Sequence, residues 1–164
     1  MRTTLFVFYL AVAPWLVAVP ALAQDAGTFS AGFVLLSDYA HLESHGGTRA
    51  SAGPVEGGGI ILESSAVPWD AGAIGRVSCV AFVRTDADGA KLTGYCNMTD
   101  AGGDTWFGQT RRSEFDPAGG GDGVLEILGG NGKYAGIKGS CPYTVGALPD
   151  RWLTVRVACD WKRE

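Results

Sequence analysis

The sequence predicts an all-β protein, an eight-stranded antiparallel β-barrel built from sequential hairpins. All 25 glycines follow residue 23 and lie between apolar segments, which is typical of a chain with many tight turns. No segment after residue 23 carries a capped apolar stripe of helical period. Sequential hairpins leave two exposed sheet edges, and closing eight strands into a barrel removes both. A two-sheet sandwich of the same strands is the alternative.

Residues 1–23 have the features of a cleavable secretory signal peptide. Arg2 precedes an apolar run from Leu5 to Val19, and an Ala-Leu-Ala sequence ends the segment. A membrane anchor would need roughly 18 or more uninterrupted apolar residues, and this run is shorter and contains a proline. We therefore expect a secreted or periplasmic protein whose mature chain, residues 24–164, is one domain without a transmembrane segment.

The charge of the mature chain argues against a nucleic-acid partner. Removing the leader takes away Arg2 and leaves 12 basic and 17 acidic residues, a net charge of −5. Binding to phosphates depends on clustered Lys and Arg, and adjacent basic residues occur only at 111–112 and 162–163. We expect no cofactor, because no phosphate-binding loop or other cofactor motif is present.

Eight segments have strand character, either alternating or continuously apolar between turn residues. Residues 35–45 are also compatible with a short helical turn. The predicted strands are 28–37, 57–63, 74–85, 90–98, 104–112, 122–128, 133–146 and 152–161.

Two hairpins predict the pairing of the four cysteines. A turn at 86–89, Asp-Ala-Asp-Gly, places Cys79 opposite Cys96. A turn through 149–151 places Cys141 opposite Cys159. Opposed residues on adjacent antiparallel strands are close enough to be bridged, and an exported protein folds under oxidising conditions. We predict these two disulfides, both on the inward face.

A third hairpin at 129–132 leaves its register open. A two-residue turn would set Glu126 opposite Ile137, a poor cross-strand pair. A three-residue loop sets Ile127 opposite Ile137 and Glu126 opposite Lys138, and we prefer it because both faces then gain a matched pair.

The same hairpin carries a resemblance to a known family. Segment 129–139 is GGNGKYAGIKG and is followed by Tyr143 and Thr144. It resembles the GGTGKYxGxxGxGxY signature of the allene oxide cyclase-like and dirigent-like barrels.

Segment 96–107 extends this resemblance. Its Cys, Asp100, Asp104 and Trp106 are similar to the Cys, Asp-x-x-Gly-Asp and aromatic pattern of small exported bacterial members of the family. The resemblance spans about residues 55–146 and implies an eight-stranded barrel with a hydrophobic cavity. In plant relatives this cavity guides cyclisation of a fatty-acid epoxide or coupling of phenoxy radicals. None of their catalytic residues can be matched here, so the catalytic residues of this chain are unknown.

Aromatic side chains are the candidates for ligand binding. Most aromatics in a small barrel pack in the core or around its rim, and some can line a cavity for an apolar ligand. The candidates are Trp69, Tyr95, Trp106, Tyr134 and Tyr143.

Three polar patterns have a simpler structural explanation. His41, Glu43 and His45 would share one face of a strand and could ligate a metal, but two histidines in a polar loop are more often solvated. The paired carboxylates of 86–89 and 100–104 lack the ligands of a full calcium loop and suit tight turns. We therefore predict no metal site.

Other polar residues give weaker indications. The Asn97-Met98-Thr99 sequon matters only in a eukaryotic secretory pathway and is interpreted as incidental. Charged residues near a barrel mouth could contact a ligand, although we expect surface exposure for each. These residues are Arg76, Arg84, Arg111 and Glu114.

The preferred hypothesis is a non-enzymatic exported barrel that binds a small hydrophobic molecule or acts as an envelope interaction module. One alternative is a cyclase-type isomerase that works mainly by positioning its substrate. Another is a protein–protein interaction or inhibitor module whose exposed loops carry the function. A cavity would favour the first two classes over the last.

Overall fold

The computed structural model describes residues 25–43, 45–115 and 120–164. The predicted signal peptide, residues 1–23, lies outside the described residues. Nine strands and three 3₁₀ turns make up the regular structure of the described chain. They are β1 (Ala26–Ser37), β2 (Ala40–Glu43), η1 (His45–Gly47), β3 (Arg49–Ser64), β4 (Ile74–Asp86), β5 (Gly89–Asp100), β6 (Thr105–Phe115), β7 (Gly121–Gly130), η2 (Gly132–Tyr134), β8 (Ile137–Ala147), η3 (Pro149–Arg151) and β9 (Trp152–Arg163).

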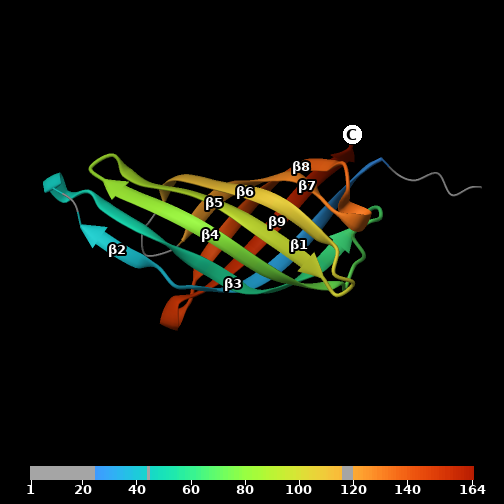
Figure 1. The fold of residues 1–164 in the computed structure, drawn as a ribbon, viewed down its shortest axis with the longest axis horizontal. Helices are drawn as coiled ribbons and strands as arrows, with labels where there is room; N and C mark the ends of the chain where they lie inside the picture. The colour runs from blue at the N-terminus through green and yellow to red at the C-terminus, as the bar shows by residue number, and fades with distance from the viewer. Residues whose placement is uncertain (1–24, 44, 116–119) are drawn as a thin grey trace, which may run out of the picture.

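The strands form a closed, elongated antiparallel barrel (Figure 1). Eight strands follow the order β1-β9-β8-β7-β6-β5-β4-β3, and β1 also pairs with β3, which closes the sheet. The short strand β2 adds to the first part of β3, beyond the pairing of β3 with β1. The predicted barrel is confirmed, with one more strand than expected, and the sandwich alternative is wrong.

Two of the predicted hairpins have the expected register. Strands β4 and β5 pair Cys79 with Cys96, and β8 and β9 pair Ser140 with Asp160, in the register that sets Cys141 against Cys159. Both disulfides are present and all four cysteines are buried. Such bonds are typical of a protein that folds in an oxidising compartment. Among the described residues, no helix has the length and apolar character needed to cross a membrane.

The preferred register of the third hairpin is wrong. Ile127 pairs with Gly139 and Glu126 with Ser140, so the strands are displaced by two residues from the expected pairing. The loop is longer because η2 turns Tyr134 into the core, where this side chain is 3% exposed. Burial of an aromatic ring therefore outweighs the ion pair and apolar pair that the shorter loop would form.

The N-terminal part also differs from the prediction. The described residues of 35–45 form the end of β1, the connection to β2, the strand β2 and the first residue of η1 instead of a helical turn, and β3 begins at Arg49 instead of residue 57. The predicted strand 57–63 included Gly57 but left out Gly53. A Cβ at Gly53 would overlap the carbonyl of Asp38, and one at Gly57 would overlap that of Val34. These glycines therefore allow close approach of neighbouring backbone within a strand.

Aromatic side chains close one end of the barrel. The loop of residues 65–73, between β3 and β4, folds over this end and inserts Trp69, which is 2% exposed. The Trp69 ring stacks on Phe29 with a centroid distance of 4.3 Å and contacts Trp106, Tyr134 and Trp161 at 5.2–6.0 Å. This end of the barrel is therefore filled by packed rings.

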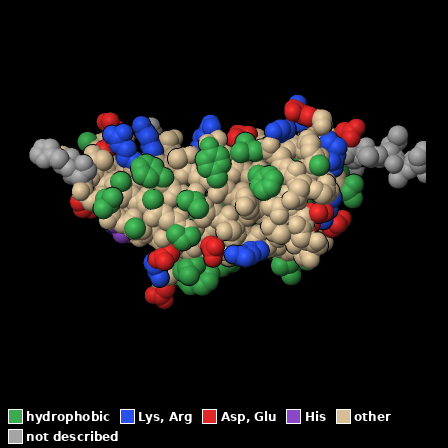
Figure 2. Space-filling model, in the orientation of Figure 1, with side chains coloured by type: hydrophobic (Ala, Val, Ile, Leu, Met, Phe, Trp, Pro, Cys, Tyr) green, Lys and Arg blue, Asp and Glu red, His purple; other side chains and the backbone are tan. Residues whose placement is uncertain are grey.

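The outer surface carries scattered apolar side chains. Figure 2 shows them along the strands of one face, with charged groups mostly towards its margins. Val80 and Tyr95, opposite each other on β4 and β5, are 69% and 60% exposed. Strand alternation thus directs some large apolar groups outward as well as inward.

Candidate functional site

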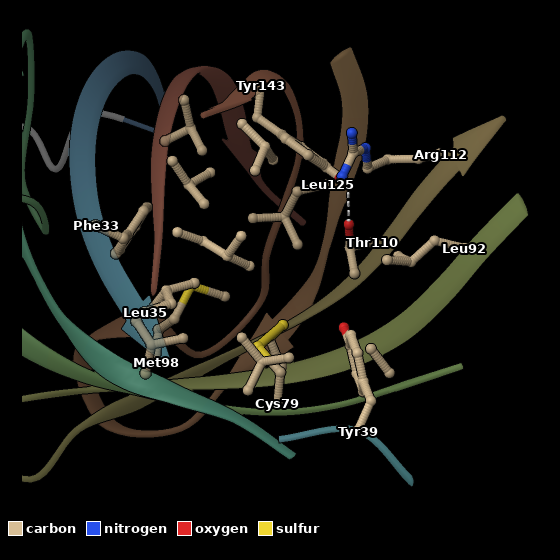
Figure 3. Close-up of a pocket in the computed structure, with 18 residues that line it drawn as sticks. Phe33, Leu35, Tyr39, Cys79, Leu92, Met98, Thr110, Arg112, Leu125 and Tyr143 are labelled. Carbon is tan, nitrogen blue, oxygen red and sulfur yellow. Dashed lines mark hydrogen bonds between the residues drawn. A yellow bond between two sulfur atoms is a disulfide. The ribbon is translucent and has the colours of Figure 1, made fainter. Parts of the chain in front are cut away.

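An apolar cavity of about 100 Å³ lies inside the barrel. Side chains from all eight barrel strands line it, and the Cys79–Cys96 disulfide forms part of its wall (Figure 3). Phe33, Val77 and Met98 line both this cavity and a smaller space of about 40 Å³ beside Trp69. The cavity therefore lies between the aromatic cluster at one end of the barrel and the β2-bearing end at the other.

A wider mouth of about 540 Å³ lies at the β2-bearing end. It shares four lining residues with the inner cavity, from β5, β6, β9 and the β1–β2 connection. They are Tyr39, Leu92, Arg112 and Leu153. The inner cavity and the mouth are therefore adjacent parts of one route into the barrel.

Arg112 lies at the boundary between the inner cavity and the mouth. Its residue exposure is 8%, because alternation along β6 directs the side chain inward with those of Trp106 and Thr110. One guanidinium nitrogen, Nη2, donates to the Gly120 carbonyl, and the guanidinium lies 4.1 Å from the centre of the Phe115 ring. Burial lowers the pKa of Arg112 from its ordinary value. An arginine nevertheless stays charged at neutral pH.

The Arg112 side chain is incompletely paired. Its Nε is buried and has no hydrogen-bond partner among the described residues. No carboxylate in the described ranges forms an ion pair with it. A buried guanidinium held by one carbonyl and one ring therefore retains unused hydrogen-bonding capacity.

Three hydroxyl groups complete the polar side of the cavity. The Tyr143 and Thr110 hydroxyls are hydrogen-bonded at 2.6 Å, and Figure 3 shows the Tyr143 ring end beside the Arg112 guanidinium. The Tyr39 side chain points into the same side of the cavity from the β1–β2 connection. Burial raises the pKa of both tyrosines, and the Arg112 charge opposes this shift. Both phenols are therefore neutral hydrogen-bonding groups at physiological pH.

Gly123 makes room for this polar group. A Cβ on Gly123 would overlap Cζ of Tyr143 and would lie 2.5 Å from Cγ of Arg112. Strand β7 therefore needs a residue without a side chain where these two groups pass.

The mouth contains further cationic groups. Arg49 pairs with Glu43 at 3.4 Å, and Arg151 pairs with Asp38, while His41 is hydrogen-bonded to Ser51 at 2.8 Å. Glu43 and Asp38 do not line the mouth, and no acidic residue of the described chain lines it or the inner cavity. The lining charge is therefore positive although the chain as a whole carries a net charge of −4.

The predicted ligand-binding aromatics occupy three different places. Tyr143 lines the inner cavity, while Trp69, Trp106 and Tyr134 belong to the aromatic cluster and border only the 40 Å³ space. Tyr95 lies on the outer surface, where its hydroxyl accepts a hydrogen bond from Gln109 at 2.9 Å. The structure therefore brings one of the five residues to the cavity.

The other predicted polar residues lie outside the cavity. Arg76 and Arg84 have side-chain exposures of 72% and 60%, and Arg111 is exposed. The Glu114 and His45 side chains are outside the described part of the structure. No three potential metal ligands lie together among the described residues.

The aspartates at 86–89 and 100–104 form hydrogen bonds within their turns. The Asp86 carboxylate accepts a hydrogen bond from the backbone N–H of Asp88. The Asp100 carboxylate accepts hydrogen bonds from the backbone N–H groups of Gly102 and Asp104. Turn chemistry thus accounts for the two leading carboxylates, as expected.

Arg112 and Tyr39 line the cavity but were not among the sequence-based candidates. Arg111, the neighbour of Arg112, was a candidate and lies on the outer face. Alternation from Trp106 through Gly108 and Thr110 would have placed Arg112 on the inner face. A single charged residue in the inward-facing row of β6, which is otherwise uncharged from Trp106 to Arg112, was the signal that could have identified Arg112.

Comparison with family models, curated proteins and solved structures finds no match to this chain. The resemblance of segments 96–107 and 129–139 to allene oxide cyclase-like barrels therefore stays a prediction.

Proposed function

We propose that this protein is an exported barrel that binds a small, mainly apolar molecule in its interior. The observation that carries the proposal is the apolar cavity of about 100 Å³ joined to a mouth of about 540 Å³. Ligand sites are typically concave and apolar, with a few polar groups that orient the ligand. The two disulfides support a working place outside the reducing cytoplasm, in the periplasm or the external medium.

The size of the cavity restricts the ligand. An engineered cavity of about 150 Å³ lined by apolar groups binds benzene, so the inner cavity alone suits a single ring or a short chain. A larger molecule would extend into the mouth, past Arg112 and Tyr39.

Native mass spectrometry tests this proposal. The gently purified mature protein is compared with the same sample after organic extraction. We expect a reproducible extra mass that extraction removes and that returns when the extract is added back. A bare mass before extraction, with no mass gained from the extract, would contradict a tightly binding carrier.

A cavity-filling variant provides a matched test. Ala81 lines the cavity and is 4% exposed, whereas its neighbour Val80 is directed outward and is 69% exposed. We expect Ala81→Leu to remove the bound mass and Val80→Leu to retain it. Retention of the ligand by a folded Ala81→Leu protein would place the ligand elsewhere.

A second candidate function is an envelope interaction module. It is favoured by exposed apolar side chains on the outer face of β4 and β5, including Val80, Phe82 and Tyr95. Replacement of Val80 and Phe82 by Ser would weaken association with a protein partner but would leave ligand binding unchanged.

A further inference from the structure

We propose that Arg112 binds the anionic head group of an amphipathic ligand whose apolar part occupies the inner cavity. This inference rests on the proposed function and specifies the ligand class: a small molecule with a short apolar tail and one negatively charged group, such as a carboxylate.

The burial of Arg112 is the first argument. Arginine is rarely buried without a partner, because removal of a charge from water carries a large desolvation cost. Arg112 is 8% exposed, and within the described chain it has one hydrogen-bonding carbonyl and no ion pair. Its Nε has no described hydrogen-bond partner. Among the described residues the side chain thus has no ion-paired carboxylate, and the charge of Asp122 acts on it only without a direct ion pair.

The position of Arg112 is the second argument. The residue lines both the apolar cavity and the mouth, so a head group bound there leaves its tail inside the barrel. The Phe115 ring and the Gly120 carbonyl hold the guanidinium in place before any ligand arrives. A pre-positioned group loses little conformational entropy on binding.

The surrounding charges are the third argument. Arg49 and Arg151, the other two arginines of the mouth, form ion pairs with Glu43 and Asp38. Arg112 is buried and forms no ion pair within the described residues. No described acidic residue lines the inner cavity or the mouth, so the charged groups of the described lining favour an anion over a cation. A planar guanidinium forms strong charge-assisted hydrogen bonds with carboxylates, and the Tyr39 hydroxyl on the same side could donate another.

Three probes with one tail and different heads test the inference: octanoate, octan-1-ol and octylammonium. Isothermal titration calorimetry at pH 7 measures their dissociation constants for the mature wild-type protein. We expect octanoate to bind at least tenfold more tightly than octan-1-ol, and octylammonium to bind more weakly than either. Equal affinities for octanoate and octan-1-ol would overturn the head-group inference but leave the proposed function standing. If none of the three probes binds, both the head-group inference and the proposed ligand-binding function are overturned for ligands of this size.

Variants locate the effect at Arg112. We expect Arg112→Met to reduce octanoate affinity to that of octan-1-ol without weakening octan-1-ol binding. Arg112→Lys, which keeps the charge, should retain a preference for octanoate. Arg111→Met removes the same charge from the next residue of β6 and should change neither affinity. An unchanged octanoate preference in Arg112→Met would assign the head group to another residue and overturn the inference.

Discussion

The burial of Arg112 is better explained by a role in ligand binding than by stabilisation of the fold. One carbonyl hydrogen bond and one contact with an aromatic ring hold its charge in a largely apolar interior. We predict that Arg112→Met keeps or raises the free energy of unfolding, by up to about 3 kcal/mol, because a methionine of similar length needs no hydration. Urea denaturation followed by tryptophan fluorescence measures the change, with Arg111→Met expected within about 0.5 kcal/mol of wild type. A loss above about 2 kcal/mol would show that Arg112 is a structural residue.

Gly123 gives a second prediction at the residue scale. In Gly123→Ala the new methyl group would overlap the Tyr143 ring and crowd the Arg112 stem. We predict a loss of about 1–3 kcal/mol in stability, as is usual for overpacking, together with weaker octanoate binding. Gly32→Ala is the matched control, because its Cβ would meet only Leu62 at an ordinary 3.7 Å. Equal stabilities of these two variants would contradict the crowding that we describe.

At the scale of elements, the β5–β6 turn and η2 are joined through Asp100. Its carboxylate forms an ion pair with Lys133 at 2.8 Å and accepts a hydrogen bond from the Tyr134 hydroxyl at 3.2 Å. It also accepts hydrogen bonds from two backbone N–H groups of its own turn. Burial raises the pKa of Asp100, but the Lys133 contact and the backbone hydrogen bond outweigh this effect, so the pKa lies below its usual 3.8. The longer loop that we did not predict is therefore anchored through η2 to the β5–β6 turn.

This anchor predicts a pH dependence. Because the folded-state pKa of Asp100 is lowered, its stabilisation is complete above about pH 4 and disappears as the pH falls through the folded-state value. We expect Asp100→Asn to cost about 1–3 kcal/mol at pH 7, with the difference from wild type shrinking towards pH 2. Urea unfolding between pH 7 and pH 2 measures the difference in free energy of unfolding between Asp100→Asn and wild type. Asp86→Asn, at the β4–β5 turn, is the control. A difference that does not depend on pH would exclude the carboxylate charge as the cause.

Tyr134 adds an effect at alkaline pH. Burial first, and then the nearby charge of Asp100, raise the pKa of the Tyr134 phenol above its ordinary value of 10.0. The unfolded chain therefore ionises first, and stability falls as the pH rises above about 10. We expect Tyr134→Phe to lose less stability than wild type between pH 9 and pH 11. Parallel curves for the two proteins would contradict this assignment.

At the scale of the whole molecule, the two disulfides constrain separate hairpins of nearly equal length. Their sequence separations are 17 and 18 residues. The chain-entropy argument predicts about 3 kcal/mol for a loop of this size, so each bridge should contribute similarly. We expect Cys79→Ala/Cys96→Ala and Cys141→Ala/Cys159→Ala to lose comparable free energies of unfolding in urea. A negligible loss for one pair would show that strain or structure in the unfolded chain cancels its effect.

The sequence by itself determined the approximate positions of the eight barrel strands, two hairpin registers, both cysteine pairs and the inward face of the cysteines. These features depend on local properties, because turn residues centre a hairpin and strand alternation then assigns every side chain to a face. Only the tertiary structure decided barrel closure through β1 and β3, the strand β2, the longer loop at η2, the insertion of Trp69 and the exposure of Tyr95. Each of these depends on contacts between residues far apart in the chain, such as the packing of Phe29 on Trp69. Arg112 belongs to both groups: alternation places it inside, but only the closed barrel shows that it borders a cavity without a described partner for its Nε.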